Sequence, residues 1–272
     1  MSSACYVYAI VRRGTPLPAL GSDGGAELAM VPWRDLSAVT RRTEDNAAAI
    51  SVAAILHHEA IVEGVRAQGP ALPVRFGTVF RDETSLTCAI AEGYQALAAD
   101  LDRLGDKIEM GLTALWSAPG AGDECAPWPR EEGVPTSESA GARYLHARAA
   151  ELRHHEALQE RASVVAGTLD QVLGVRALEQ RQSLLPTRSG VLRAAYLLNP
   201  RQVSDFRAAF DALSLARRDL GLLLTGPWPP YSFVRRTETE CPREADAQFV
   251  ELLQILTNPA SLLSRCGARL AY

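Results

Sequence analysis

The sequence predicts an α+β protein of two domains, in which each domain is a mostly antiparallel sheet covered by helices. Three observations support this class. Short segments rich in β-branched and aromatic residues alternate with longer segments of helical periodicity. A stretch dominated by Gly, Pro, Ser and acids separates two such series at residues 117–140. The chain has 272 residues, 47% of them hydrophobic, which is enough to build a core on each side of that stretch.

The first domain is expected at residues 1–116, with its elements in the order βββαβαβ. The strands are short apolar segments that end in turn signals. They are expected at residues 5–11, 27–33, 35–42, 71–80 and 107–116. The helices show apolar residues at helical spacing and are expected at residues 46–69 and 82–106. Asn46 is the expected N-cap of the first helix, and Gly69–Pro70 is its stop signal.

Residues 117–140 are expected to form an acidic linker rich in Gly and Pro. They hold five acids and one base, a net charge of −4, which equals the formal charge of the whole chain. The formal charges outside this linker therefore sum to zero, and the two folded parts have no strong net electrostatic field.

The second domain is expected at residues 141–234. A long helix over residues 142–174 leads it, because this segment is dense in Ala, Leu, Glu and Arg. Residues 175–185 fit either a helix or a strand. The remaining elements are a strand at 190–199, a helix at 200–221 and a fully apolar, central strand at 221–226. The order αββαβ predicts a ferredoxin-like sandwich. A helical tail is expected at 235–272.

The long helix also admits another interpretation, a coiled-coil oligomer. Its apolar positions keep no strict heptad, which favours packing against its own sheet.

Composition argues against several functions. The formal net charge of −4 gives no basic field for nucleic acid. No apolar run is long enough to span a bilayer, and the start of the chain has no charged leader, so a cytoplasmic location is expected. The five cysteines are scattered and none is spaced as C-x-x-C, which argues against a disulfide framework or a zinc knuckle.

The tetrapeptide HHEA occurs twice, at 57–60 and 154–157, and raises the question of a metal site. Adjacent residues on a helix point about 100° apart, so His57 and His58 do not share one ion, and the i+4 positions hold no second ligand. We expect one partly buried and one exposed histidine, and neither a metal nor a cofactor. No phosphate-binding loop or nucleophile elbow is present, so an enzyme is not expected.

Two segments stand out as candidates for binding a partner. Residues 72–80 place Arg75 in an otherwise apolar strand, with Phe76 on the opposite side; Arg75 is expected to pair with an acid such as Glu109. Residues 224–233 combine three prolines with aromatic side chains. They form either a structural corner or an exposed patch that binds a partner. The candidate residues are Arg75, Phe76, Trp228, Tyr231 and Phe233.

These segments resemble one family. YVYAIV near the start, a histidine on the first helix, LPVRFGTVF, and AAYLLN followed by GLLLTGPWPPYSF look like the gas vesicle proteins GvpL/GvpF. The resemblance covers about residues 6–233, and residues 235–272 fall outside it.

The resemblance implies a non-enzymatic role as a minor structural component or assembly factor of gas vesicles. It implies binding to the hydrophobic shell protein GvpA. Other gas vesicle accessory proteins are further candidate partners. The vesicle-associated location would be cytoplasmic, with neither membrane nor nucleic acid as a partner. The alternative is a ferredoxin-like small-ligand sensor or enzyme, which a deep polar pocket containing His57 or His155 would favour.

Overall fold

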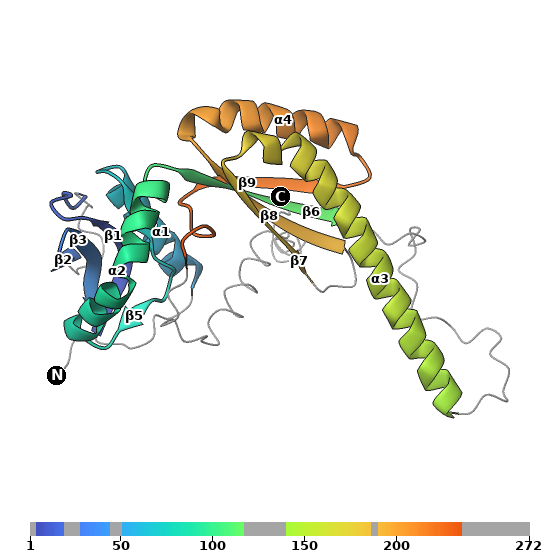
Figure 1. Cartoon of the computed structure of the whole chain (residues 1–272), viewed down its shortest axis with the longest axis horizontal. Coiled ribbons are helices and arrows are strands. Elements are labelled where there is room, and N and C mark those ends of the chain that lie inside the picture. Colours follow the sequence, from blue (N-terminus) through green and yellow to red (C-terminus); the bar gives the residue numbers. More distant parts are fainter. Residues whose placement is uncertain (1–3, 19–27, 44–50, 117–139, 186–189, 236–272) are drawn as a thin grey trace, which may run out of the picture. The chain divides into compact units, whose positions relative to one another are not determined.

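The computed structural model describes residues 4–18, 28–43, 51–116, 140–185 and 190–235, without the side chains at 142, 147, 150, 151 and 154. The chain divides into two compact units, each built around an antiparallel sheet with helices (Figure 1). The predicted α+β class is confirmed. Most of the predicted linker and of the predicted helical tail at 235–272 lies outside the described residues.

The first sheet has the strand order β2-β3-β1-β4, and β5 also pairs with β1. The strands are β1 (Ala4–Arg12), β2 (Leu28–Trp33), β3 (Leu36–Thr43), β4 (Ala71–Pro73) and β5 (Val79–Phe80). β1 is central and is buried from its first residue to Val11.

Two helices accompany this sheet, α1 (Val52–Arg66) and α2 (Glu83–Leu104). α1 begins at Val52, where the Ser51 side chain accepts a hydrogen bond from the Ala54 N–H and caps the helix. Asp82 caps α2 in the same way through the Ser85 N–H. The expected N-cap of α1, Asn46, lies outside the described residues.

The predicted strand at 71–80 is not continuous. β4 ends at Pro73, a turn follows, and β5 is only two residues long. Gly77 has a φ of 82°, a left-handed conformation that favours glycine and breaks an extended strand. The assignment of Phe76 and Arg75 to opposite faces of one strand is therefore wrong.

The second unit contains β6 (Ile108–Trp116), α3 (Ala140–Val172), β7 (Glu179–Leu185), β8 (Gly190–Leu198), α4 (Val203–Ala216) and β9 (Gly221–Trp228), with short 3₁₀ turns at Gly174–Arg176 and Pro200–Gln202. The sheet order is β7-β8-β6-β9, and all three pairings are antiparallel. This is the βαββαβ arrangement of a ferredoxin-like fold. The sequence predicts that fold but with the order αββαβ, without the first strand.

β6 completes that motif, so assigning residues 107–116 to the first domain was wrong. All nine β6 residues pair with β8, from Ile108–Leu198 to Trp116–Gly190. Consecutive elements usually lie side by side, which favoured a local sheet, but the apolar alternation of β6 fits either sheet equally well.

β9 lies at the edge of this sheet, although its apolar sequence suggested a central strand. Leu222 and Leu224 pack against the core beneath α3 and α4, whereas Leu223 points to the other face. Both helices therefore cover one face of the sheet. We call the opposite face, which bears Leu115 and Leu223, the open face.

Among the described residues, no helix combines the length and apolar character needed to cross a membrane.

Candidate partner-binding site

The first candidate segment is the turn at residues 74–78, between β4 and β5. Backbone hydrogen bonds tie both of its ends to β1, from the Val74 N–H to the Tyr8 carbonyl and from the Val7 N–H to the Thr78 carbonyl. Within the turn, the Thr78 hydroxyl donates to the Arg75 carbonyl over 2.9 Å. Arg75 is half-buried, so the turn presents only part of its side chain to a partner.

Phe76 belongs to a buried aromatic cluster behind this turn. Its ring meets the His58 imidazole edge-on, with centroids 5.7 Å apart, and the Tyr6 ring at 6.2 Å. Tyr8 stacks on His58 at 5.3 Å. Phe76 is half-buried, and these ring contacts anchor the turn to β1 and α1.

A chain of hydrogen bonds runs through the same cluster. The imidazole Nε2 of His58 lies 2.9 Å from the Val74 carbonyl and must donate to it, so Nδ1 accepts the hydroxyl proton of Tyr6, also over 2.9 Å. The Tyr6 oxygen in turn accepts the Gly77 N–H over 3.0 Å. Burial lowers the pKa of His58 to about 4 and raises that of Tyr6 to about 12. Both groups are neutral at physiological pH.

The first histidine pair matches the expectation of one exposed and one buried histidine, and of the second pair only the side chain of His155 is described. His57 is exposed and His58 is buried with both ring nitrogens hydrogen-bonded, so His58 has no free lone pair for a metal. In the second copy, His155 is exposed, and its Nε2 lies 2.9 Å from the Gln159 side-chain nitrogen. Within the described ranges, no cluster of three potential metal ligands occurs.

The second candidate segment follows β9. A bulge opens where β9 passes Glu109 and Gly111 of β6, and Gly226 lies in it with a φ of 108°. A side chain at Gly226 would come within 2.8 Å of the Glu109 carbonyl oxygen. The Arg207 guanidinium of α4 donates to the Gly226 carbonyl over 2.9 Å, which fixes the exit of the strand.

The Glu109 carboxylate holds the loop beyond the bulge. It accepts hydrogen bonds from the Ser232 N–H over 2.8 Å and from the Ser232 hydroxyl over 2.6 Å. Glu109 is buried, and burial raises its pKa while the Ser232 bonds oppose that change. The sequence suggests Glu109 as a partner for Arg75, and in the structure the Glu109 carboxylate accepts hydrogen bonds from Ser232.

Phe233 is fully buried, so it presents no surface to a partner. The Arg181 guanidinium lies 5.5 Å from its ring centroid, and Arg103 donates to its carbonyl over 2.9 Å. Tyr231 is half-buried, and Trp228 is 43% exposed. Of the three aromatic residues predicted here, Trp228 therefore offers the largest exposed surface.

Two exposed residues of the same sheet are not among those predicted from the sequence. Leu115 of β6 is 46% exposed and Leu223 of β9 is 38% exposed. Leu223 pairs with Thr113, two residues from Leu115, so both leucines lie on the open face. Trp228 pairs with Glu109 and falls on the same face. Recognising β6 as the first strand of a ferredoxin-like motif would have revealed this set.

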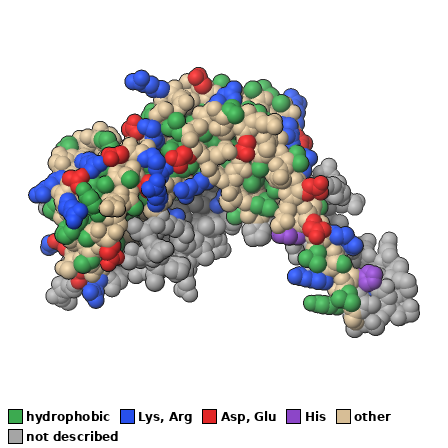
Figure 2. All heavy atoms as spheres, viewed as in Figure 1, with side chains coloured by type: hydrophobic (Ala, Val, Ile, Leu, Met, Phe, Trp, Pro, Cys, Tyr) green, Lys and Arg blue, Asp and Glu red, His purple; other side chains and the backbone are tan. Residues whose placement is uncertain are grey.

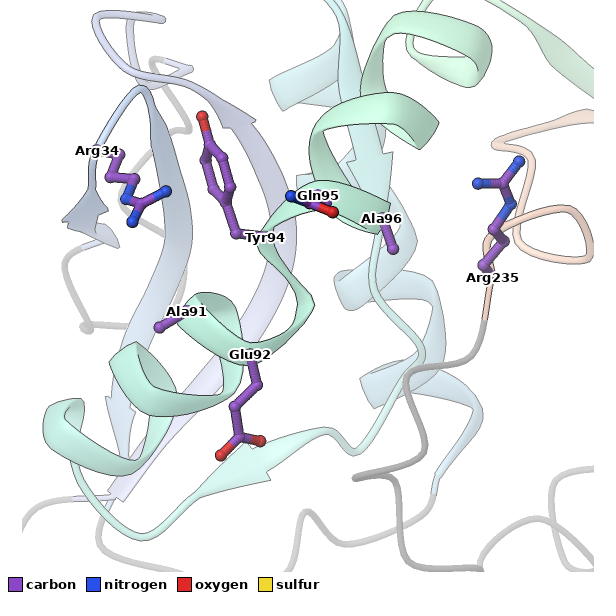
Figure 3. Close-up of a pocket in the computed structure, with 7 residues that line it drawn as sticks. All are labelled: Arg34, Ala91, Glu92, Tyr94, Gln95, Ala96 and Arg235. Atoms are coloured by element: carbon purple, nitrogen blue, oxygen red, sulfur yellow. The ribbon is translucent and has the colours of Figure 1, made fainter.

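The first unit also has a shallow cavity of about 680 Å³, shown in Figure 3. Its lining comprises Arg34, Ala91, Glu92, Tyr94, Gln95, Ala96 and Arg235. The Arg34 guanidinium lies 4.8 Å from the centroid of the Tyr94 ring. The Tyr94 hydroxyl donates to Asp35 over 2.5 Å. Neither His57 nor His155 lines this cavity.

A family model described as gas vesicle synthesis protein GvpL/GvpF matches residues 4–235. The chain belongs to the GvpL/GvpF family. Its role is therefore connected with gas vesicles. The match ends where the description of the structure ends, and residues 236–272 lie beyond it.

Individual members of the GvpL/GvpF family show the same relationship. Gas vesicle protein L of a Streptomyces species is 27% identical over 191 residues, 67% of this chain and 69% of that protein. Gas vesicle protein F2 of Halobacterium salinarum is 27% identical over 238 residues, 85% of this chain and 92% of that protein. The crystal structure of GvpF from an Anabaena species superposes with a TM-score of 0.65 and 18% identity over 89% of this chain and all of that one, a likeness of fold.

Proposed function

We propose that this chain is an assembly factor or minor structural component of gas vesicles that binds the hydrophobic shell protein GvpA and helps to build the vesicle wall. The shell protein must present an apolar face to gas, and such a face aggregates in water unless another surface covers it. A protein that covers or pairs with it before assembly would solve this problem without catalysis. The proposed site of action is the vesicle wall in the cytoplasm.

The open face of the second sheet carries this proposal. Leu115, Leu223 and Trp228 form a row of partly exposed apolar side chains on it. Gly111, Thr113 and Thr225 are small residues of β6 and β9 on the same face, and Gly111 and Thr225 lie between the two leucines and Trp228. A surface of this kind suits an extended or helical apolar segment.

The free edge of β9 adds a second means of recognition. β9 is outermost in the sheet order, so among the described strands it pairs only with β6. A strand of the shell protein could add to this edge through backbone hydrogen bonds. The Gly226 bulge ends the regular edge, which would limit such pairing to residues 221–225.

A co-purification experiment with tagged shell protein tests the proposal. Leu223→Ser and Trp228→Ala, singly and together, should reduce the amount of the chain that the shell protein retains, and Tyr231→Ala should reduce it less. Leu215→Ala is a matched control, because Leu215 of α4 is 70% exposed but lies away from the open face. Undiminished retention of the folded double variant would remove the open face as the binding surface.

A small-ligand sensor or enzyme has less support. That function was expected to show a deep polar pocket containing His57 or His155. The cavity in Figure 3 is open, and the second described cavity, lined by Asp106 and Asn199–Gln202, contains neither histidine. Both ring nitrogens of His58 are already hydrogen-bonded, one to Tyr6 and the other to the Val74 carbonyl.

A further inference from the structure

The first half of α3 lies beyond the sheet that its second half covers. The buried positions of α3 begin at Leu158 and continue through Leu169. Before Leu158, no described side chain of this helix is buried. Figure 1 shows this part of α3 running past the end of its sheet, and Figure 2 shows hydrophobic, basic and acidic side chains on its surface. We call residues 140–157 the α3 arm.

The α3 arm exposes large apolar side chains. Tyr144 is 69% exposed, Leu145 is 66% exposed and Leu152 is 50% exposed. Leu145, Ala149 and Leu152 are spaced by four and three residues, so they lie along one side of the helix. A partner along this side would remove these apolar side chains from water.

Two charges on this side of the helix are placed symmetrically about Leu152. Arg148 lies four residues before Leu152, and Glu156 lies four residues after it. If a second copy lies antiparallel with Leu152 on the twofold axis, each Arg148 faces the Glu156 of the other copy. Two ion pairs then flank a central contact between the two Leu152 side chains.

Small residues at the ends of the same side permit close approach. Gly141 and Ser163 each lie eleven residues from Leu152, in opposite directions, so each would face the other across the axis. One turn further along α3, a side chain at Gly167 would meet nothing within 4 Å. The surface therefore remains accessible where the arm joins the body of the unit.

We propose that the α3 arm is a self-association surface, through which two copies of this chain pair as antiparallel helices about Leu152. The overlap from Gly141 to Ser163 spans about 33 Å at the helical rise per residue. One pair of helices of that length buries less surface than a typical stable complex, so we expect a weak, concentration-dependent dimer. The proposal does not depend on binding to the shell protein.

Sedimentation velocity of the full chain over a concentration series tests this pairing. The wild type should shift from monomer to dimer as concentration rises into the high micromolar range. Arg148→Glu or Glu156→Arg alone should weaken dimerisation roughly tenfold or more, because two attractive pairs become repulsive. The double variant that exchanges both charges should restore it. A parallel pair would not give this restoration, because each Arg148 would then face the other Arg148.

Two further variants make the result decisive. Arg143 lies nine residues from Leu152, half a turn away around the helix, so Arg143→Glu should leave dimerisation unchanged. Leu152→Glu should abolish the dimer, since two carboxylates would meet on the axis. Circular dichroism should report that every variant keeps its fold. The proposal would be overturned if the wild type stays monomeric at every concentration, or if the charge substitutions leave dimerisation unchanged.

Discussion

The hydroxyl of Tyr6 in β1 donates to Nδ1 of His58 in α1, and the same oxygen receives the N–H of Gly77. This single hydroxyl joins a strand, a helix and the turn that bears Arg75 and Phe76. His58 lies 52 positions and Gly77 lies 71 positions after Tyr6 in the chain, and both contact the same oxygen atom. The first of the two HHEA sequences is thereby accounted for as part of the scaffold.

We predict that Tyr6→Phe lowers the free energy of unfolding by about 2 kcal/mol, because His58 Nδ1 and the Gly77 N–H both lose a buried hydrogen-bond partner. Urea denaturation measures this change. Tyr144→Phe is the matched control, since Tyr144 is largely exposed, and should leave stability unaltered. Equal stability of the two variants would mean that the hydrogen-bond chain does not hold the turn.

His58 should make the protein sensitive to mild acid. Its pKa in the folded state is lowered to about 4 from the usual 6.5. The unfolded state therefore binds more protons between these values, and stability is lost as the pH falls from about 6.5 towards 4. The contribution is on the order of 3 kcal/mol and is fully present above pH 6.5.

Comparing unfolding free energies at pH 7.5 and pH 5 isolates this contribution. His58→Gln should reduce the loss between the two pH values, whereas His57→Gln, at an exposed position, should match the wild type. A wild type and His58→Gln variant with the same pH dependence would contradict the buried, neutral state of His58.

Gly226 should tolerate no side chain. Gly226→Ala combines a left-handed φ with an approach of 2.8 Å to the Glu109 carbonyl, so we expect a loss of about 2 kcal/mol or more. Gly221→Ala in the same strand makes only an ordinary contact of 3.5 Å with Leu115 and should be tolerated. Thermal unfolding of the two variants distinguishes them, and similar melting temperatures would argue against the bulge geometry.

The Glu109–Ser232 contact should be essential for the loop after β9. Glu109→Ala leaves the Ser232 N–H without its acceptor and should destabilise the second unit by about 2 kcal/mol. Glu109→Gln keeps an acceptor oxygen and should cost much less. Chemical denaturation followed by tryptophan fluorescence reports the difference. A Gln variant as unstable as the Ala variant would show that charge, not hydrogen bonding, holds Ser232.

Much of the fold could be predicted from local patterns. Helix α3 and strand β8 follow from propensity and apolar spacing, and the two-sheet α+β class follows from their alternation. The strand at Ile108–Trp116 was recognised but placed in the wrong sheet, because its pattern of buried Met110, Leu112 and Ala114 does not specify a neighbour. The sheet that this strand joins is decided by pairing with strands distant in the sequence, and the local residue pattern does not specify that pairing.

The candidate surface was only partly predictable for the same reason. Trp228 was found because prolines surround it, but Phe233 was grouped with it although it is buried beneath Arg181. Leu223 was missed because three consecutive leucines indicate a central strand, while β9 is an edge. The family resemblance indicates a role connected with gas vesicles, which spacing and composition alone do not indicate.

Deletion of the gene in its native cluster, followed by electron microscopy of the cells, tests the central claim most directly. Without the gene, we expect few or malformed gas vesicles, and wild-type complementation should restore them. The Leu223→Ser/Trp228→Ala double variant should fail to restore them at equal protein level, whereas Leu215→Ala should succeed. Normal vesicles in the deletion strain, or full restoration by the double variant, would contradict a role for the open face in vesicle assembly.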